Sequence, residues 1–75
     1  MTYSERADAV YVQLAEVEVA RTKQLDDRRM IDLAQDGTVV GVEFLDASTG
    51  IDLTDIPSPN RIHDAVRKLN FPVFA

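Results

Sequence analysis

The sequence predicts an α+β domain: an antiparallel β-meander of four to five strands with one C-terminal helix packed on one sheet face. Three observations carry this prediction. Apolar residues alternate over Ala9–Leu14, an Asp-Gly turn separates two further alternating runs, and apolar residues recur at helical spacing after Ser58-Pro59. The 75 residues are predicted to form a single domain, with the sheet in 1–48, the helix in 58–70 and a tail in 71–75.

Strand-like alternation is clearest near the N-terminus. Three aliphatic residues fall on one face of Ala9–Leu14 and Tyr11 on the other, which is the period of two that a strand requires. A weaker strand is expected over residues 19–25, followed by a polar turn at residues 26–28. Residues 46–54 are expected to form an irregular connection.

A hairpin is predicted around Asp36-Gly37, because a two-residue turn needs a positive φ that Asp tolerates and Gly adopts freely. With these two residues in the loop, Ile31 faces Val42 and Leu33 faces Val40. The predicted pairs on the opposite face are Met30–Glu43, Asp32–Gly41 and Ala34–Val39. A glycine inside the strand indicates a bulge there or the close approach of another group.

Ser58 and Pro59 are typical of a helix start, with Ser as the N-cap and Pro at the first helical position. The apolar residues that follow form one stripe at i, i+3, i+4 and i+7: Ile62, Ala65, Val66 and Leu69. Asp64 is expected to pair with Lys68 on the exposed side, and Asn70 to end the helix.

The two faces of the sheet differ in composition. The predicted buried face consists of aliphatic residues and one phenylalanine: Val10, Val12, Leu14, Ile31, Leu33, Val40, Val42 and Phe44. The other face is half apolar, and one helix cannot cover both. Together with the aromatic residues of the tail, this second face supplies the predicted interface candidates: Tyr11, Met30, Val39, Leu45, Phe71 and Phe74.

The size of the chain limits its core. A domain of 75 residues buries only about 60% of its surface, which is marginal for a single chain. The chain has no cysteine, so neither a disulfide nor a zinc–thiolate site can support the fold. We therefore expect a homodimer or higher homo-oligomer. Without cysteine, a signal-like start or a membrane-length apolar run, a soluble, cytoplasmic protein without membrane contact is expected.

Charge is unevenly distributed along the chain. Residues 1–60 carry 12 acids against 5 bases, a net charge of −7, whereas residues 61–75 carry a net charge of +2. An acidic sheet of this kind repels nucleic-acid phosphates and favours a basic protein partner. Solubility alone is the simpler interpretation of the same charge.

The sequence contains no catalytic or metal-binding pattern, and we predict neither an enzyme nor a cofactor nor a metal. His63 is the only histidine and lies beside Asp64, which is too small a ligand set for a metal. No calcium-loop pattern of alternating acids around a glycine surrounds Asp26, Asp27 or Asp32, which we interpret as turn and surface residues.

Tyr11 with Arg21 and Lys23 on an open sheet face resembles a stacking platform for single-stranded nucleic acid. Glu43 and Asp32 are expected in the same neighbourhood, and the domain is acidic overall. We therefore predict no nucleic-acid binding by this chain alone.

The order of these motifs resembles a small bacterial family, domain of unknown function 2283. The resemblance covers residues 3–48 and rests on these positions: Tyr3, Ala7–Val12, Leu25, Ile31–Leu33, Asp36–Leu45 and Ala47–Ser48. At residues 27–29 this chain departs from the glycine-containing turn that is usual in the family. The resemblance implies a short β-meander with a helix and no assigned activity. It also implies an antitoxin-like or partner-binding role, since some relatives lie beside genes for small toxin-like proteins.

Three functional hypotheses follow from the sequence. The leading one is a non-catalytic interaction module that self-associates. The alternative is a small-ligand or metal-responsive binder that uses a pocket between sheet and helix, or the acids Asp26, Asp27 and Asp32. The third is an enzyme whose site is assembled between subunits, with His63 as its acid or base.

Overall fold

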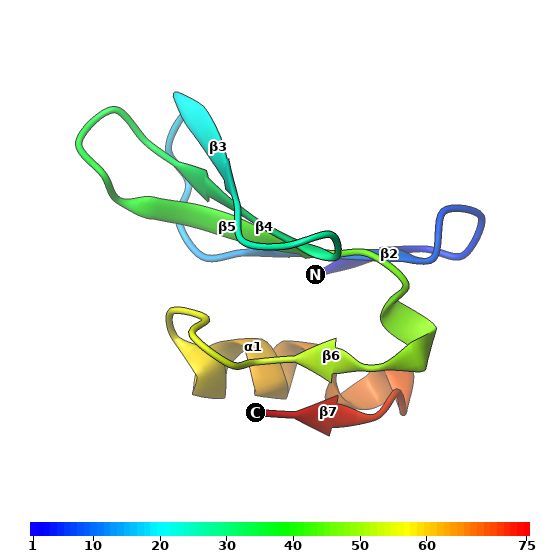
Figure 1. Cartoon of the computed structure of the whole chain (residues 1–75). Helices are drawn as coiled ribbons and strands as arrows, with labels where there is room; N and C mark the ends of the chain where they lie inside the picture. Colours follow the sequence, from blue (N-terminus) through cyan, green and yellow to red (C-terminus); the bar gives the residue numbers. More distant parts are fainter.

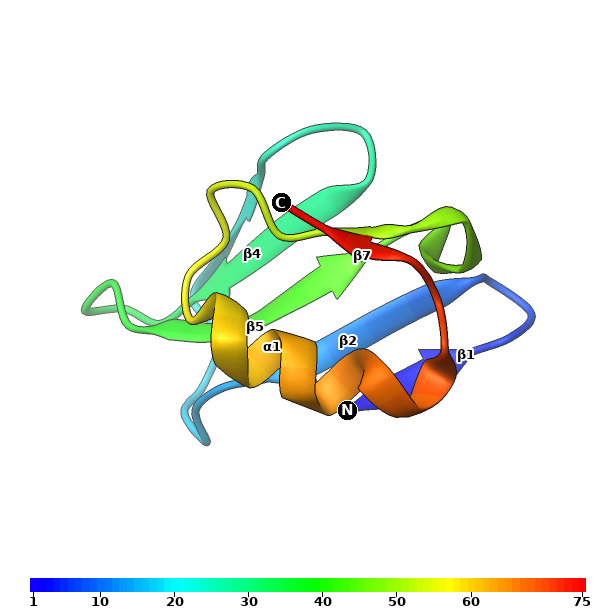
Figure 2. The same ribbon diagram turned by 90° about the horizontal axis from the view of Figure 1, so that it is seen from below.

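Two layers of secondary structure face each other in this computed structural model, which describes residues 1–75 (Figure 1). The first layer is an antiparallel sheet of five strands: β1 (Thr2–Ser4), β2 (Ala9–Gln13), β3 (Arg21–Gln24), β4 (Arg29–Leu33) and β5 (Val39–Phe44). The second layer contains the 3₁₀ turn η1 (Ala47–Thr49), β6 (Ile51–Asp52), the helix α1 (Pro59–Val66), its 3₁₀ extension η2 (Arg67–Leu69) and β7 (Val73–Phe74). Seen from below, α1 runs beside the β6–β7 pair, and together they cover one face of the sheet (Figure 2). The predicted α+β class is confirmed.

The strand order in the sheet is β1-β2-β5-β4-β3. β1–β2 and β3–β4–β5 are consecutive antiparallel neighbours, as a meander requires, but β2 pairs with β5 instead of β3. This pairing places Val10 opposite Phe44 and Val12 opposite Val42, so apolar residues meet across the centre of the sheet. As a result β3 forms one edge of the sheet, and all four of its residues are exposed.

The register of the β4–β5 hairpin follows the prediction over most of its length. The confirmed pairs are Met30–Glu43, Ile31–Val42 and Asp32–Gly41. Nearer the turn, Leu33 faces Val39 instead of Val40. The turn is one residue longer than predicted: the Gly37 amide, at φ +90°, donates to the Ala34 carbonyl at 3.0 Å. The extra residue shifts the register by one, and Val40 becomes a β-bulge.

The core draws on both layers. Its 11 buried residues are Val10, Val12, Ile31, Val42, Phe44, Ala47, Ile51, Leu53, Ile56, Ile62 and Val66. Of the eight residues predicted on the inner face, six are buried, and Leu14 and Leu33 are half-buried against the core. The prediction of an irregular connection over 46–54 is wrong, because this segment forms η1 and β6 and supplies Ala47, Ile51 and Leu53 to the core.

The helix lies where the sequence predicts it. Ser58 occupies the N-cap position, but its backbone is left-handed at φ 51° and its side chain makes no capping hydrogen bond. The predicted stripe packs against the sheet, and Asn70, left-handed at φ 58°, ends η2. On the exposed side Asp64 pairs with Arg67 at 3.6 Å, in place of the predicted Lys68. The single α-helix, α1, has eight residues and is too short to span a membrane.

The C-terminal tail packs on its own chain. The Phe71 ring meets the Tyr3 ring edge-on, with centroids 5.2 Å apart. β7 pairs in parallel with β6: the Ile51 amide donates to the Pro72 carbonyl at 2.8 Å, and the Leu53 amide donates to the Phe74 carbonyl at 2.7 Å. The tail therefore belongs to the second layer and adds no strand to the main sheet.

Candidate functional site

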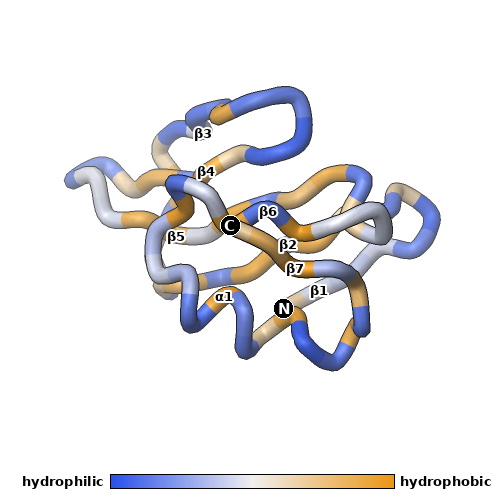
Figure 3. Tube along the Cα trace, turned by 60° about the horizontal axis from the view of Figure 1, so that its bottom comes forward, coloured by the Kyte–Doolittle hydropathy of each residue, from blue (hydrophilic) through white to orange (hydrophobic).

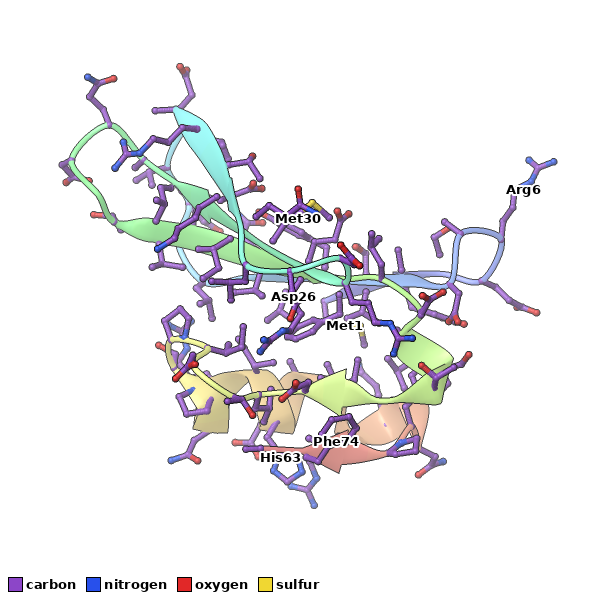
Figure 4. All side chains as sticks on the ribbon, in the orientation of Figure 1. Met1, Arg6, Asp26, Met30, His63 and Phe74 are labelled. Atoms are coloured by element: carbon purple, nitrogen blue, oxygen red, sulfur yellow. The ribbon has the colours of Figure 1, made fainter.

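The six predicted interface residues do not form one surface. Tyr11 and Met30 lie in the sheet layer, Val39 and Phe71 pack against the core, and Leu45 and Phe74 line a cleft between the layers. Figure 4 shows Met30 on the side of the sheet that faces away from the helix, and Phe74 on the second layer. The sequence placed Val39 on the second face, and the shifted register beside the β-bulge explains why it packs against the core instead.

Tyr11 takes part in a polar network on the outer face. Its ring crosses Gly41, where a Cβ atom would overlap the phenol, so the predicted close approach at this glycine is confirmed. The Tyr11 hydroxyl donates to Asp32 Oδ2 at 2.9 Å, and the Thr22 hydroxyl donates to Asp32 Oδ1 at 2.6 Å. Burial, followed by the hydrogen bond to Asp32, raises the pKa of Tyr11 to about 12. The central row of this face is thus hydrogen-bonded and gives little support to an apolar interface.

The nucleic-acid and metal arrangements considered from the sequence are not assembled. Thr22 contacts Asp32 on the outer face, so the alternating neighbours Arg21 and Lys23 belong to the opposite face from Tyr11. Asp26 bonds to Arg29 while Asp32 bonds to Tyr11, so these acids do not converge. No group of three or more His, Cys, Asp or Glu side chains is placed to hold a metal ion.

His63 is exposed on α1 and points away from the sheet (Figure 4).

A cleft of about 440 Å³ opens where the β3–β4 turn faces β6 and β7. Its lining residues are Asp26, Asp27, Arg28, Arg29, Phe44, Leu45, Gly50, Asp52 and Phe74. Figure 3 shows the β3–β4 turn as hydrophilic and the β7 segment as largely hydrophobic, so the two sides of the cleft differ in character. Figure 4 shows Asp26 at the junction of the layers, above Phe74.

Arg29 forms the structural anchor of the cleft. Its side chain is 12% exposed, and its Nε and Nη2 donate to Asp26 Oδ2 at 3.0 and 2.8 Å. Its Nη1 crosses to the second layer, where it donates to the backbone carbonyls of Asp52, at 3.3 Å, and Thr54. One side chain at the start of β4 therefore ties the sheet to the β6 segment. The hydrogen bonds from Arg29 lower the pKa of Asp26, and the backbone bond from Thr54 lowers the pKa of Asp52.

The apolar part of the cleft is set by Gly50 and Phe74. Gly50 has φ +151°, a conformation that favours glycine, and a Cβ atom there would overlap the Phe74 ring. Phe74 rests on this glycine yet remains 52% exposed, with Leu45 half-buried in the same cleft. The cleft thus combines exposed apolar surface with the carboxylates of Asp26, Asp27 and Asp52.

Asp8 positions η1, which leads into the Gly50 side of the cleft. Its Oδ1 accepts bonds from the Tyr3 hydroxyl at 2.9 Å and the Ser48 amide at 3.0 Å, and its Oδ2 accepts the Ser48 hydroxyl at 2.6 Å. The bond from the Ser48 side chain is the main cause of a lowered pKa at Asp8.

Sequence reasoning missed Arg29 and Asp8 as organising residues. Their partners lie up to 40 residues away along the chain. The one available signal for Asp8 was that Asp8 and Ser48 both fall within the positions on which the family resemblance rests.

Comparison with known proteins gives one result. No curated protein and no solved structure matches the chain. A family model matches residues 1–48, which contain the whole five-stranded sheet and the Asp8–Ser48 contact, and which leave most of the second layer outside. The chain therefore belongs to the family described as protein of unknown function (DUF2283).

Proposed function

We propose that the protein is a non-catalytic interaction module that self-associates, and that a second copy docks at the cleft between the two layers. The observation that carries this proposal is that Leu45 and the half-exposed Phe74 line the same cleft. Large aromatic side chains that anchor in a partner's pocket supply much of the affinity of protein interfaces.

Self-association also suits the small core. The folded chain exposes 4840 Å², close to the value expected for its mass, so no unusual packing offsets its size. Covering Phe74 and Leu45 of both copies would add apolar burial that one chain cannot reach alone.

Charge determines how such an association responds to salt. Each copy carries a net charge of −5, so two copies repel each other over long range. Added salt screens this repulsion, and self-association should strengthen. A basic protein at the same cleft, which an antitoxin-like role would require, should show the opposite dependence.

Sedimentation velocity over a range of protein concentrations tests the proposal. The wild-type mass should rise above the 8.4 kDa of one chain as concentration increases, and more so at high salt. Phe74→Ser and Leu45→Ser should shift the protein toward monomer. Val17→Ser is the matched control, because Val17 is also exposed, at 49%, but does not line the cleft. A wild-type mass of 8.4 kDa at every concentration would overturn the proposal.

The volume of the cleft favours small-ligand binding as a second candidate. About 440 Å³ lies within the range of roughly 300–1,000 Å³ that ligand pockets occupy. An aromatic amine matches both parts of the lining, since its cation can meet Asp52 and its ring can stack on Phe74. Tyramine should then shift the amide resonances of residues 50–53 in an NMR titration, and Asp52→Asn should weaken binding. Unchanged resonances at saturating tyramine would remove this candidate.

A further inference from the structure

The segment Phe71–Ala75 ends the second layer, and the side chains of Phe71 and Val73 pack against the core. β7 is a parallel two-residue strand, and its backbone hydrogen bonds to the β6 segment include those from the Ile51 and Leu53 amides. Parallel pairs are slightly weaker than antiparallel ones, and an isolated two-stranded pair is marginal in water. As a chain end attached through one short strand pair, this segment can detach without breaking any pair of the main sheet.

We propose that two copies exchange this segment, so that β7 of each chain pairs with β6 of the other and each cleft is completed by the partner's Phe74. The proposal rests on the self-association proposed above and specifies how the second copy is bound.

The tail is received at two places, Gly50 and Tyr3, which together form its seat and determine which segment can bind there. Gly50 leaves room for an aromatic ring that any side chain at this position would fill, and Phe74 occupies that room. Tyr3 receives the ring of Phe71 edge-on, so two aromatic residues three positions apart are recognised together. The segment known to fit both places is the tail of this same sequence, which is why we assign the seat to a second copy.

The hinge for the exchange lies at Asn70. This residue adopts a left-handed conformation at φ 58°, ends η2 and separates the helix from the tail. Asn tolerates left-handed and extended conformations more easily than most residues, so the chain can change direction here without disturbing α1.

Exchange preserves every contact that the tail makes within one chain, because each contact re-forms on the partner. The difference between the two states therefore arises from the hinge and from the new surface where the copies meet. That surface adjoins the cleft, where Leu45 and the exposed part of Phe74 would be covered. A single chain should retain its own tail at low concentration, and the exchanged pair should form as concentration rises.

An isotope-filtered NOE experiment on the unaltered protein tests the exchange. Chains labelled with carbon-13 and unlabelled chains are mixed and incubated at a concentration where sedimentation shows dimers. The spectrum then selects contacts between labelled and unlabelled chains. We expect intermolecular NOEs from the Gly50 Hα protons to the Phe74 ring, and from the Tyr3 ring to the Phe71 ring.

Gly41 and Tyr11 provide the internal control. They form the same ring-over-glycine contact, but both lie within the sheet and should give only intramolecular NOEs. If the Gly50–Phe74 contact is also purely intramolecular in confirmed dimers, the exchange is wrong and the self-association stands. If sedimentation finds only monomers, both proposals fail together.

Discussion

The guanidinium of Arg29 donates two hydrogen bonds to a single carboxylate oxygen of Asp26, at 3.0 Å from Nε and 2.8 Å from Nη2. This geometry leaves Nη1 free to reach backbone carbonyls in the second layer. The contact stabilises both the β3–β4 turn and the junction of the two layers, which is where the cleft lies. The cleft should therefore lose its shape together with this contact.

Arg29→Met should lower the free energy of unfolding by about 1–3 kcal/mol, because it removes charge-assisted hydrogen bonds from a mostly buried group. Urea unfolding measures this loss. Arg28→Met is the control: the side chains of Arg28 and Asp46 are 63% and 62% exposed, and such a pair contributes within about 1 kcal/mol. Equal losses in the two variants would contradict the anchoring role of Arg29.

Gly41→Ala should destabilise the sheet by about 1–3 kcal/mol, because the new methyl group overlaps the Tyr11 ring. In a Tyr11→Ala background the overlap disappears, so the same substitution should cost much less there. A double-mutant cycle by urea unfolding measures the difference. Additive losses would show that Tyr11 does not lie over this glycine.

The hairpin could be predicted pair by pair because each apolar residue of one strand meets an apolar residue of the other. Met30–Glu43 and Ile31–Val42 followed from the position of the turn. The register shift that pairs Leu33 with Val39 could not be predicted in this way. Asp-Gly fits both a two-residue and a three-residue turn, and the two turns differ by one residue in register. That single residue determined on which side Val39 lies.

The second layer could be predicted only in part. The helix was predictable from its apolar stripe, but β6 and β7 are two residues each and have no measurable period. Their parallel pairing joins Ile51 to Val73 and Asp52 to Phe74, on either side of the helix in the sequence. The convergence of Leu45 with Phe74 depends on that pairing, so the cleft could not be derived from the sequence.

Acid should weaken the fold through Asp8. The pKa of Asp8 in the folded chain lies below its ordinary value of 3.8 because Ser48 and Tyr3 donate to the carboxylate. The stability it contributes is therefore present above pH 3.8 and is lost as the pH falls through the folded-state pKa. Asp8→Asn retains the left-handed backbone but cannot titrate, so its stability should depend less on pH in this range. Thermal unfolding at a series of acidic pH values measures how the stability of the wild-type and Asp8→Asn chains depends on pH. An equal dependence in the two chains would contradict this role of Asp8.

Alkali should weaken the fold through Tyr11. Its pKa in the folded chain is raised from 10.0 to about 12, so the folded state holds the phenolic proton more tightly than the unfolded state does. This contribution is complete below pH 10.0 and is lost as the pH rises toward about 12.

Ultraviolet titration of a Tyr3→Phe variant measures Tyr11 alone, because the chain has two tyrosines and no tryptophan. Circular dichroism on the same samples reports whether the fold is intact. A phenol that ionises near pH 10.0 in a folded chain would show that Tyr11 is neither buried nor hydrogen-bonded to Asp32 in solution.

Val39→Asp distinguishes the interface expected from the sequence from the one proposed at the cleft. If Val39 lay on an exposed association surface, the aspartate would weaken association and leave the chain folded. The structure places this side chain half-buried against the core, where an unpaired carboxylate is costly, so the substitution should lower the free energy of unfolding by about 1–3 kcal/mol. Met30→Asp, on the outer face of the sheet, is the matched comparison and should cost less. Urea unfolding and sedimentation of both variants distinguish the cases: a fully stable Val39→Asp chain with a lower mass would restore the outer face as the interface.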